Sequence, residues 1–449
     1  MELTRPVAEF VAQTRLDGID VAAAHHARWL LIDAVGCALA GHGSREFHTT
    51  RQALTNIGPQ GDATVLGEDR HPLLNAVFLN AYLITALTAC DFHVPTRCHV
   101  TPEVVPAALA VGERFDRGGE ELLTAVALGA EVTVRVGVAF DFSAKHARGW
   151  HAPGLSGVIG AAAAAGRMLR LDAPRMVNAL ALAAAQAAGT FVGHGTPQLK
   201  FNQARAALSG VLAAFIGAEA FPTTPEPFLG INGGLLTPTY TDHARPELLV
   251  DQLGEVWQLL QISLRRWPAG TSIQSVIDCL LEITTANAIG LDDVKRLDVT
   301  LAPASAQLHG HQPHPRTPFL ALLSTHYVAA ALLADGHFWL PSVAPSRLAD
   351  PRLQAFADRV VVSADDSVPD AGAVTSLLTH DGRTLVAKRD FPRGHPSDPL
   401  SDDEMRAKFL RCAQERLDPP RARRLLAMLE RVEHVSVREI LSAATPGAA

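Results

Sequence analysis

The sequence has few charged residues and few aromatic residues. Asp, Glu, Lys and Arg make up 19% of its 449 residues and aromatic residues 6%, whereas apolar residues make up 48%. Disordered chains show the opposite balance, with high charge and little apolar material. The composition therefore predicts a folded protein. A single hydrophobic core normally divides at this length, so we expect two domains.

The sequence also lacks a run of basic residues, and its formal net charge is -7. Both features argue against nucleic acid as a partner. A small anionic substrate is still compatible with them, because a local cationic pocket can form in an acidic protein. The longest apolar stretch, WLLIDAVGCALAG, contains Asp33 and is too short to cross a bilayer. We therefore expect no membrane partner.

Cysteine is sparse, and its number is odd. The chain contains Cys37, Cys90, Cys98, Cys279 and Cys412. Such a set, without a secretory signal, predicts reduced thiols rather than a disulfide framework. The N-terminal segment MELTRPVAEF is neither cationic nor continuously apolar, so it does not read as a signal peptide. A cytoplasmic location is the resulting expectation.

Several nucleotide and hydrolase motifs are missing. The segment GHGTPQLK lacks the spacing of a phosphate-binding loop, and no G-x-S-x-G nucleophile elbow occurs. The segment GVIGAAAAAG follows no predicted strand, so it indicates close helix packing rather than a dinucleotide site.

Helical periodicity dominates what is present. Residues 1–265 predict one helix after another, for example residues 20–41 with a cap at Asp20 and a stop at Gly41. Strand-like alternation begins after Pro268 and includes a hairpin at Asp381 and Gly382, and helices return at Ser401. The predicted fold is mainly α. It has a large all-helical domain, residues 1–265 and 394–449, and a smaller inserted α+β domain, residues 266–393.

The segment CDFHVPTRCHVTPEV, residues 90–104, gathers potential metal ligands and a helix start. Zinc sites use spacings such as C-x2-C or H-x3-H, but here Cys90 precedes His93 by three positions and Cys98 adjoins His99. The spacing therefore predicts no metal site. Thr101 is the predicted N-cap of the next helix. This would place His99 beside a helix N-terminus, which favours an anion and a proton-transferring imidazole.

Further polar residues occur at predicted loop-to-helix junctions. His151 precedes a Gly- and Ala-rich helix, Lys200 begins another, and Arg265 lies at the domain junction. His309 lies in a His-rich loop, QLHGHQPHP. Taken singly, each also fits an ordinary role as a surface histidine, a solvated lysine or a partner in an interdomain ion pair. Their shared position favours a site.

Segments spread over nearly the whole chain resemble those of the MmgE/PrpD family, in the same order. They include LLIDAVGCALAG, PEVVPAALAVGE, GWHAPGLSGVIGAAAAAGRML, LKFNQARAALSGVLAA, SLRRWPAG and HPSDPLSDDEMRAKF. The family includes 2-methylcitrate dehydratase, cis-aconitate decarboxylase and iminodisuccinate epimerase. The resemblance implies a homodimer of chains with a helical domain and an α+β lid, and a site in the cleft between these domains. It implies no metal and no organic cofactor.

The resemblance also assigns residues. It places the catalytic set at Asp91, His99, His151 and Lys200. The two histidines would transfer protons, and Asp91 would orient or tune a histidine. Lys200 would stabilise charge beside a substrate carboxylate.

Four other positions depart from the family pattern or lack a firm counterpart in it. Arg265 stands where the family has lysine, and Gln274 where it usually has histidine. An arginine can clamp a carboxylate with two hydrogen bonds but stays charged, and glutamine cannot titrate. His309 occupies the approximate place of a tyrosine, and His93 has no secure counterpart. We expect these four residues to contact the substrate.

The sequence thus predicts a cofactor-independent lyase that dehydrates a small di- or tricarboxylate resembling 2-methylcitrate, by proton transfer next to a carboxylate. Decarboxylation of a cis-aconitate type and epimerisation of an iminodisuccinate type are alternatives within the family. Two alternatives come from other classes. One is a metal-dependent hydrolase using His93, His99 and the loop histidines His309, His311 and His314. The other is a catalytically silent scaffold.

Overall fold

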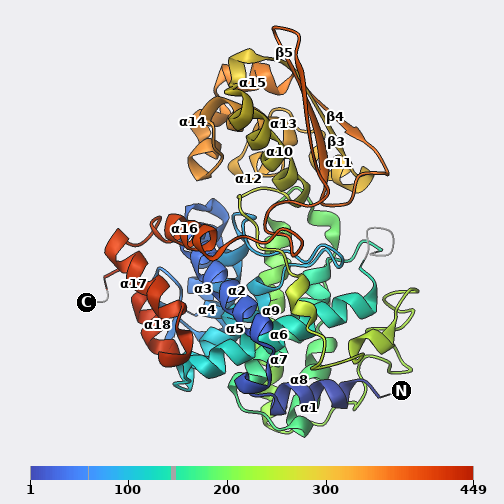
Figure 1. Ribbon diagram of the computed structural model, residues 1–449. Coiled ribbons are helices and arrows are strands. Elements are labelled where there is room, and N and C mark those ends of the chain that lie inside the picture. The colour runs from blue at the N-terminus through green and yellow to red at the C-terminus, as the bar shows by residue number, and fades with distance from the viewer. Residues whose placement is uncertain (1, 59, 143–147, 448–449) are drawn as a thin grey trace. The chain divides into compact units, whose positions relative to one another are not determined.

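The computed structural model describes residues 2–58, 60–142 and 148–447 and is mainly helical, which confirms the predicted class (Figure 1). Its contacts divide the chain into two compact units. Unit 1 comprises Met1–Ala86, Cys90–Ile262 and Ser401–Ala449, and unit 2 comprises Leu87–Ala89 and Ser263–Leu400. Unit 2 is therefore inserted in the sequence of unit 1. Its short segment 87–89 has no counterpart in the expected boundaries.

Unit 1 consists of helices, short turns of 3-10 helix and one small antiparallel pair of strands, β1 (Ala63–Thr64) and β2 (Arg70–His71). The helices are α1 (Thr4–Gln13), α2 (Val21–Ala40), α3 (Arg45–Ile57), α4 (Leu73–Thr85), α5 (Thr101–Arg114), α6 (Gly119–Phe140), α7 (Ala152–Met168), α8 (Ala173–Ala184), α9 (Gln198–Ala218), α16 (Asp402–Ala413), α17 (Pro419–Leu429) and α18 (Val437–Ala443).

The predicted signals at the ends of α2 are confirmed. The Asp20 side chain accepts hydrogen bonds from the backbone N–H groups of Ala22 and Ala23, and Gly41 follows the last helical residue. The two hydrogen bonds to Asp20 satisfy backbone N–H groups that the first turn leaves without an intrahelical partner.

Helix α6 is long and apolar enough to cross a membrane, judged by length and composition alone. In unit 1, however, 94% of its apolar window is buried. Core helices of compact proteins have the same composition, because they are covered on every side. This burial accounts for the hydropathy of α6 without a bilayer.

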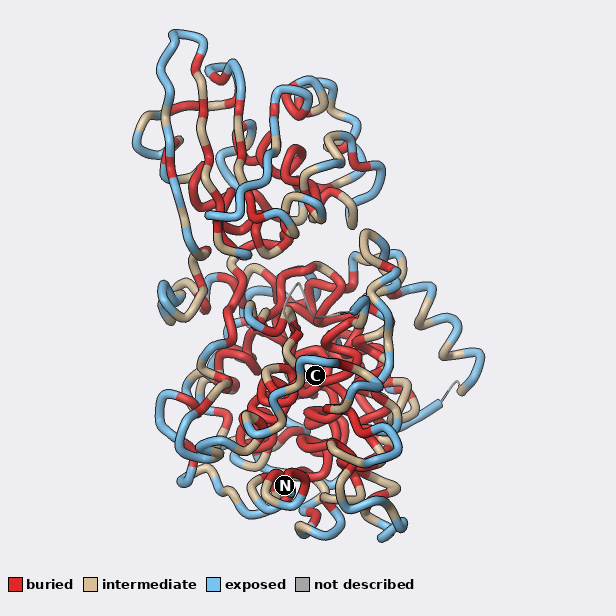
Figure 2. The backbone as a smooth tube through the Cα atoms, turned by 90° about the vertical axis from the view of Figure 1, so that its right-hand side faces the viewer, coloured by how far each residue is buried: buried red, intermediate tan, exposed pale blue. Residues whose placement is uncertain are grey.

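Helix α7 is the centre of unit 1 and packs against α5, α6, α8 and α9. Glycines bring its neighbours close. A Cβ atom at Gly210 on α9 would lie 2.5 Å from the Ala161 Cβ on α7, and one at Gly160 would lie 2.6 Å from the Gly129 carbonyl oxygen on α6. Both distances are shorter than any real carbon contact. The backbones therefore touch almost directly, and Figure 2 shows this interior as continuously buried tube.

Unit 2 is an α+β unit built on a four-stranded sheet in the order β4-β3-β5-β6. Strand β3 (Val294–Leu301) pairs parallel with β4 (Val360–Ala364) and antiparallel with β5 (Ala373–Thr379), which pairs with β6 (Thr384–Arg389) through the predicted hairpin. Alternate residues of β5 are buried, so one face of the sheet is covered. The unit's helices are α10 (Thr271–Asn287), α11 (Pro303–His309), α12 (Pro318–Ala321), α13 (Thr325–Asp335), α14 (Pro345–Leu348) and α15 (Pro351–Ala357).

A buried ion pair joins the two ends of the unit 1 sequence. The Lys408 ammonium on α16 lies 2.5 Å from the Asp33 carboxylate on α2, and both side chains are almost completely buried. Nearby, Gly36 on α2 lets the ring of Phe409 approach, since a Cβ there would lie 3.1 Å from that ring. The negative charge of Asp33 raises the pKa of Lys408 against the opposing effect of burial. The lysine therefore remains charged in the core.

Removal of this lysine should destabilise the protein strongly. We expect Lys408→Met to lower the free energy of unfolding by about 3–5 kcal/mol, because the Asp33 carboxylate would stay buried without its cation. Urea unfolding followed by circular dichroism measures the change. Arg406→Met, on the same helix but half-exposed, is the matched control and should cost less than about 1 kcal/mol. Equal losses in the two variants would contradict this account.

Candidate functional site

Asp91 caps helix α5 from the preceding loop. Its carboxylate accepts hydrogen bonds from the backbone N–H of Val100 at 2.8 Å and of Thr101 at 3.0 Å, and also from the Thr101 hydroxyl. The prediction that Thr101 is the N-cap is wrong. The helix begins at Thr101, and Val100, which precedes it, has no side chain that can cap. Asp91 therefore fulfils from nine residues upstream the role that a cap residue normally has.

Burial sets the charge state of Asp91. The side chain is fully buried, which raises its pKa to about 6, while the hydrogen bonds from Thr101 and Val100 act in the opposite direction. The negative charge of Asp33 adds to the increase. Asp91 is thus a carboxyl group that titrates near neutral pH and already uses both oxygen atoms to hold a helix.

The same residue positions His99 through its backbone. The His99 Nδ1 atom lies 2.7 Å from the Asp91 carbonyl oxygen and 3.6 Å from the Cys90 sulfur. A carbonyl oxygen can only accept, so Nδ1 carries the hydrogen. In the neutral ring, Nε2 then holds the lone pair. His99 is half-buried and therefore keeps some access to solvent. Asp91 thus holds the His99 ring by its carbonyl group rather than by its carboxylate, and its role in catalysis stays a prediction.

His93 lies in the small hairpin between Asp91 and His99. Its backbone N–H and carbonyl form a two-way bridge with Cys98, at 2.8 and 3.3 Å, and its ring Nδ1 lies 2.7 Å from the Thr96 hydroxyl. The ring is buried. These contacts close the hairpin and fix the path of the chain into α5. The expectation that His93 binds substrate stays a prediction.

His151 precedes α7 and is buried. Its backbone N–H donates to the Gly189 carbonyl at 2.9 Å. Burial, together with the positive charges of Lys200 and Arg205, lowers the pKa of its ring to about 3. The imidazole is therefore neutral at physiological pH. Its Nδ1 atom is buried and has no hydrogen-bond partner among the described residues, which leaves it available to a ligand.

Lys200 belongs to a buried polar network between α4 and α9. Its ammonium group donates to the Thr85 hydroxyl at 3.2 Å, and that hydroxyl donates to the Gln203 side-chain oxygen at 2.8 Å. All three side chains are at most 6% exposed. Sequence reasoning missed Thr85 and Gln203, because each lies inside an apolar helical stretch. Their positions, facing a lysine from within the helices, become visible only in three dimensions.

Glu103, in the first turn of α5, is a further residue that the sequence did not single out as part of a site. It is completely buried, and neither carboxyl oxygen has a hydrogen-bond partner in the described part of the chain. Burial, followed by the negative charge of Asp91, raises its pKa well above the usual range, and the positive charge of Lys200 opposes this. Glu103 thus lies in the electrostatic environment of the predicted set.

The other predicted residues belong to unit 2. Arg265 is buried and donates to the Thr88 carbonyl oxygen and the Thr271 hydroxyl, both at 2.8 Å. His309 ends α11, and its Nδ1 lies 3.1 Å from the Leu323 carbonyl oxygen. For both residues, substrate contact stays a prediction.

Gln274 has a defined structural task in unit 2. Its side-chain oxygen accepts from the Trp267 N–H at 3.1 Å, and its nitrogen donates to the carbonyls of Trp267 and Ala269 at 2.7 and 2.9 Å. The amide therefore pins the turn that precedes α10. Histidine, which the family usually has here, could not make all three bonds at once.

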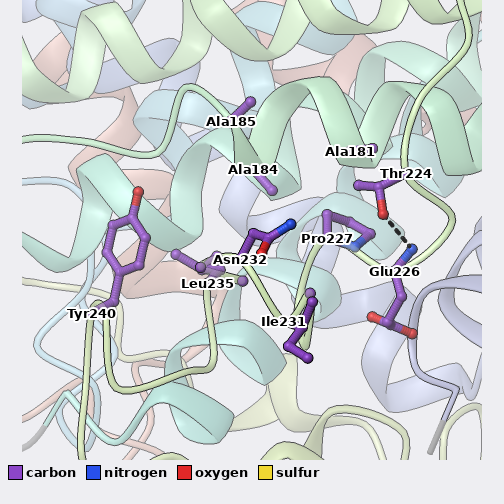
Figure 3. Close-up of a pocket in the computed structure, with 13 residues that line it drawn as sticks. Ala181, Ala184, Ala185, Thr224, Glu226, Pro227, Ile231, Asn232, Leu235 and Tyr240 are labelled. Atoms are coloured by element: carbon purple, nitrogen blue, oxygen red, sulfur yellow. Dashed lines mark hydrogen bonds between the residues drawn. The ribbon is translucent and has the colours of Figure 1, made fainter.

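Two other features bear on the kind of site. Among the described residues, no group of three or more His, Cys, Asp or Glu side chains could hold a metal ion. A pocket of about 360 Å³ lies between α8 and residues 224–240, and Tyr240 and Ile231 line it (Figure 3). None of the predicted site residues lines this pocket. The candidate site therefore rests on the polar cluster near α5, α7 and α9 rather than on this pocket.

Comparisons with known proteins agree with the resemblance noted in the sequence. The MmgE/PrpD N-terminal domain matches residues 5–243, and the MmgE/PrpD C-terminal domain matches residues 267–434. A cis-aconitate decarboxylase-like protein of Aspergillus oryzae, oryM, is 25% identical over 94% of this chain and 93% of its own length. The cis-aconitate decarboxylases of mouse and human are 25% and 24% identical, over 92% and 93% of this chain and 87% and 89% of their own lengths.

The raised pKa of Asp91 predicts a pH-dependent stability. Because the pKa of Asp91 is higher in the folded protein than in the unfolded chain, the native state binds more protons between about pH 4 and 6. The contribution of Asp91 to the free energy of unfolding therefore falls as the pH rises through that range. The wild type should lose about 3 kcal/mol relative to Asp91→Asn between about pH 4 and 7. Urea unfolding at several pH values measures this difference. Asp20→Asn, at the exposed cap of α2, is the control. The assignment would be contradicted if the difference in unfolding free energy between the wild type and Asp91→Asn did not change with pH. It would also be contradicted if the wild type gained stability relative to the variant as the pH rose.

Proposed function

This chain belongs to the MmgE/PrpD family, and we propose that it is a lyase that decarboxylates a small tricarboxylate of the cis-aconitate type. The names of the curated relatives support decarboxylation in preference to the dehydration expected from the sequence. Dehydration of a compound resembling 2-methylcitrate and epimerisation of an iminodisuccinate type remain the alternatives to be tested. The proposal needs no cofactor.

The observation that carries the proposal is the buried ammonium group of Lys200 near a neutral histidine. Its positive charge contributes to the lowered pKa of His151, so the two groups share one electrostatic environment. Coulomb attraction is stronger in such a buried setting than in water. A substrate carboxylate is the natural counterion for this ammonium group. The neutral His151 ring can add a hydrogen bond without adding charge.

Decarboxylation requires the protein to stabilise a developing negative charge and to deliver a proton. As the carboxylate leaves as CO2, the electron pair of the broken bond stays on the substrate, where a neighbouring double bond and carboxylate can delocalise it. A cation near that carboxylate stabilises the developing charge, and we assign this role to Lys200. A proton must then be delivered to carbon. We assign this step to His99, whose Nδ1–H is held by the Asp91 carbonyl: Nε2 first takes up a proton from water, and the imidazolium then delivers that proton to carbon and returns to the neutral ring.

The structural data refine the expected roles of the other residues. The resting ring of His151 is neutral at physiological pH, because burial and the positive charges of Lys200 and Arg205 lower its pKa. We propose that it orients the substrate. Arg265 retains its proposed role of recognising a carboxylate. No group of three His, Cys, Asp or Glu side chains among the described residues could hold a metal ion, so the structure offers no support for the hydrolase alternative.

A substrate panel tests the reaction. We expect purified protein to release CO2 from cis-aconitate and to leave an unsaturated dicarboxylate, with kcat in the usual range of about 1–1000 per second. Citrate and 2-methylcitrate test dehydration, and an iminodisuccinate tests epimerisation. NMR of the reaction mixtures identifies the products. Loss of water without CO2, or turnover of none of these acids, would refute the decarboxylase assignment.

Substitution of His99 tests its role in proton delivery. His99→Ala should lower kcat by about 100-fold or more while the thermal midpoint stays close to that of the wild type. Lys200→Met should both raise KM and lower kcat, because it removes the contact to the bound carboxylate and the stabilisation of the developing charge. His48→Ala, at an exposed position on α3, is the control for both. Wild-type turnover by the His99→Ala protein would overturn the assignment.

A further inference from the structure

Glu103 is held in place by a glycine on the neighbouring helix. If Gly157 of α7 carried a Cβ, that atom would lie 2.6 Å from the Glu103 Cγ and 3.0 Å from its Cδ. The glutamate side chain therefore fills the space that the glycine leaves. It cannot swing out toward solvent, because α5 buries every residue of its first three turns.

The carboxyl group of Glu103 has no local structural task. Within the described residues, both of its oxygens are buried and form no hydrogen bond. Leaving a buried polar group unsatisfied costs about 1–3 kcal/mol, and a buried charge costs more. Glu113 on the same helix shows the ordinary arrangement, because its carboxylate accepts from the Thr64 N–H at 2.7 Å and from the Thr64 hydroxyl at 2.5 Å. The contrast marks Glu103 as unusual.

The charged and titratable groups around Glu103 come from several elements. Asp91, from the loop before α5, and Lys200, from α9, both act on its ionisation. Cys98 is the third such group. Burial, followed by the negative charge of Glu103, raises the pKa of its thiol. The Cys98 sulfur lies 3.4 Å from the Ser156 hydroxyl of α7. Of these three residues around Glu103, Lys200 carries the positive charge. If Glu103 were ionised, its negative charge would offset that of Lys200.

We propose that Glu103 is a positioning residue that controls anion binding at Lys200, because a substrate carboxylate binds there only while Glu103 keeps its proton. This inference rests on the proposed function of Lys200. When Glu103 is ionised, binding of the substrate anion takes up one proton from water, which forms the O–H bond of the Glu103 carboxylic acid. No other bond changes. Affinity for polycarboxylates therefore falls as the pH rises and Glu103 loses its proton.

Calorimetry with tricarballylate, a saturated tricarboxylate that cannot be decarboxylated by the proposed route, tests this inference. For the wild type, we expect Kd to rise with pH above the raised pKa of Glu103, by up to tenfold per pH unit, with proton uptake detected from the dependence of the heat on the buffer. For Glu103→Gln, whose amide is neutral at every pH, Kd should change less than about twofold over the same range.

A second measurement uses stability. Because burial disfavours the ionised form of Glu103, the wild type should lose stability relative to Glu103→Gln as the pH rises above about 4.5. Glu113→Gln is the matched control. It should lose stability, since its bonds to Thr64 are weakened, and keep the pH dependence of tricarballylate binding.

The outcomes separate the two proposals. Binding of tricarballylate with proton uptake, but no turnover of cis-aconitate, refutes the decarboxylase and leaves the role of Glu103 intact. Turnover combined with a pH-independent Kd in the wild type, or a pH dependence that persists in Glu103→Gln, overturns the role of Glu103 alone. Absence of any binding by the wild type overturns the role of Glu103, and it overturns both proposals when turnover of cis-aconitate is absent as well. The proton-uptake measurement needs no variant, so it decides even if Glu103→Gln fails to fold.

Discussion

Asp91 is the residue on which the geometry of the candidate site in unit 1 depends. Its carboxylate holds the first turn of α5, and its carbonyl holds the ring of His99. A single loop residue therefore fixes both a helix and the imidazole ring of His99. The hairpin closed by His93 and Cys98 supports this arrangement, since it brings the chain back to Val100 at the point where Asp91 can reach it. The loop that contains Asp91 and the first turn of α5 therefore hold each other in position.

The packing of α7 explains why charge states near this loop are unusual. Where helices touch through glycine and alanine, little space remains for water, and polar side chains lie in a medium of low polarity. Burial then lowers the pKa of a histidine and raises that of a carboxylic acid. His151 and Glu103 show the two directions of this effect. Lys200 remains in contact with Thr85 and so keeps at least one hydrogen bond in the core.

Much of the fold could be predicted from the sequence, because it follows from local signals. The cap at Asp20, the alternation in β5 and the turn at Gly382 are encoded within a few residues of the elements they define. The return of segment 401–449 to the first unit came from the family resemblance and from its helical periodicity. The segment 87–89 was missed, since three residues carry no periodicity.

The site could be predicted only in part. Asp91, His99, His151 and Lys200 were singled out by the family resemblance, and three of them also by their place at predicted helix starts; their role as a catalytic set stays a prediction. Their charge states could not be found, because these depend on burial and on neighbours far away in the sequence. Glu103 was not singled out from the sequence, and only the packing of α5 against α7 at Gly157 reveals that it is enclosed. For Gln274, substrate contact stays a prediction, and its three backbone bonds add a structural task that the sequence did not indicate.

The glycine contacts of α7 also limit how this protein can change over time. At Gly160, an added methyl group would meet the Thr133 side chain and the Gly129 carbonyl oxygen of α6, and at Gly210 it would meet the Ala161 Cβ and backbone atoms of α7. Such positions cannot accept larger residues one at a time, because the helices themselves would have to separate. Substitutions in unit 1 are therefore accommodated more readily at exposed loop positions, such as Pro95, than in the helical core. The rigidity of the interior directs variation to its edge.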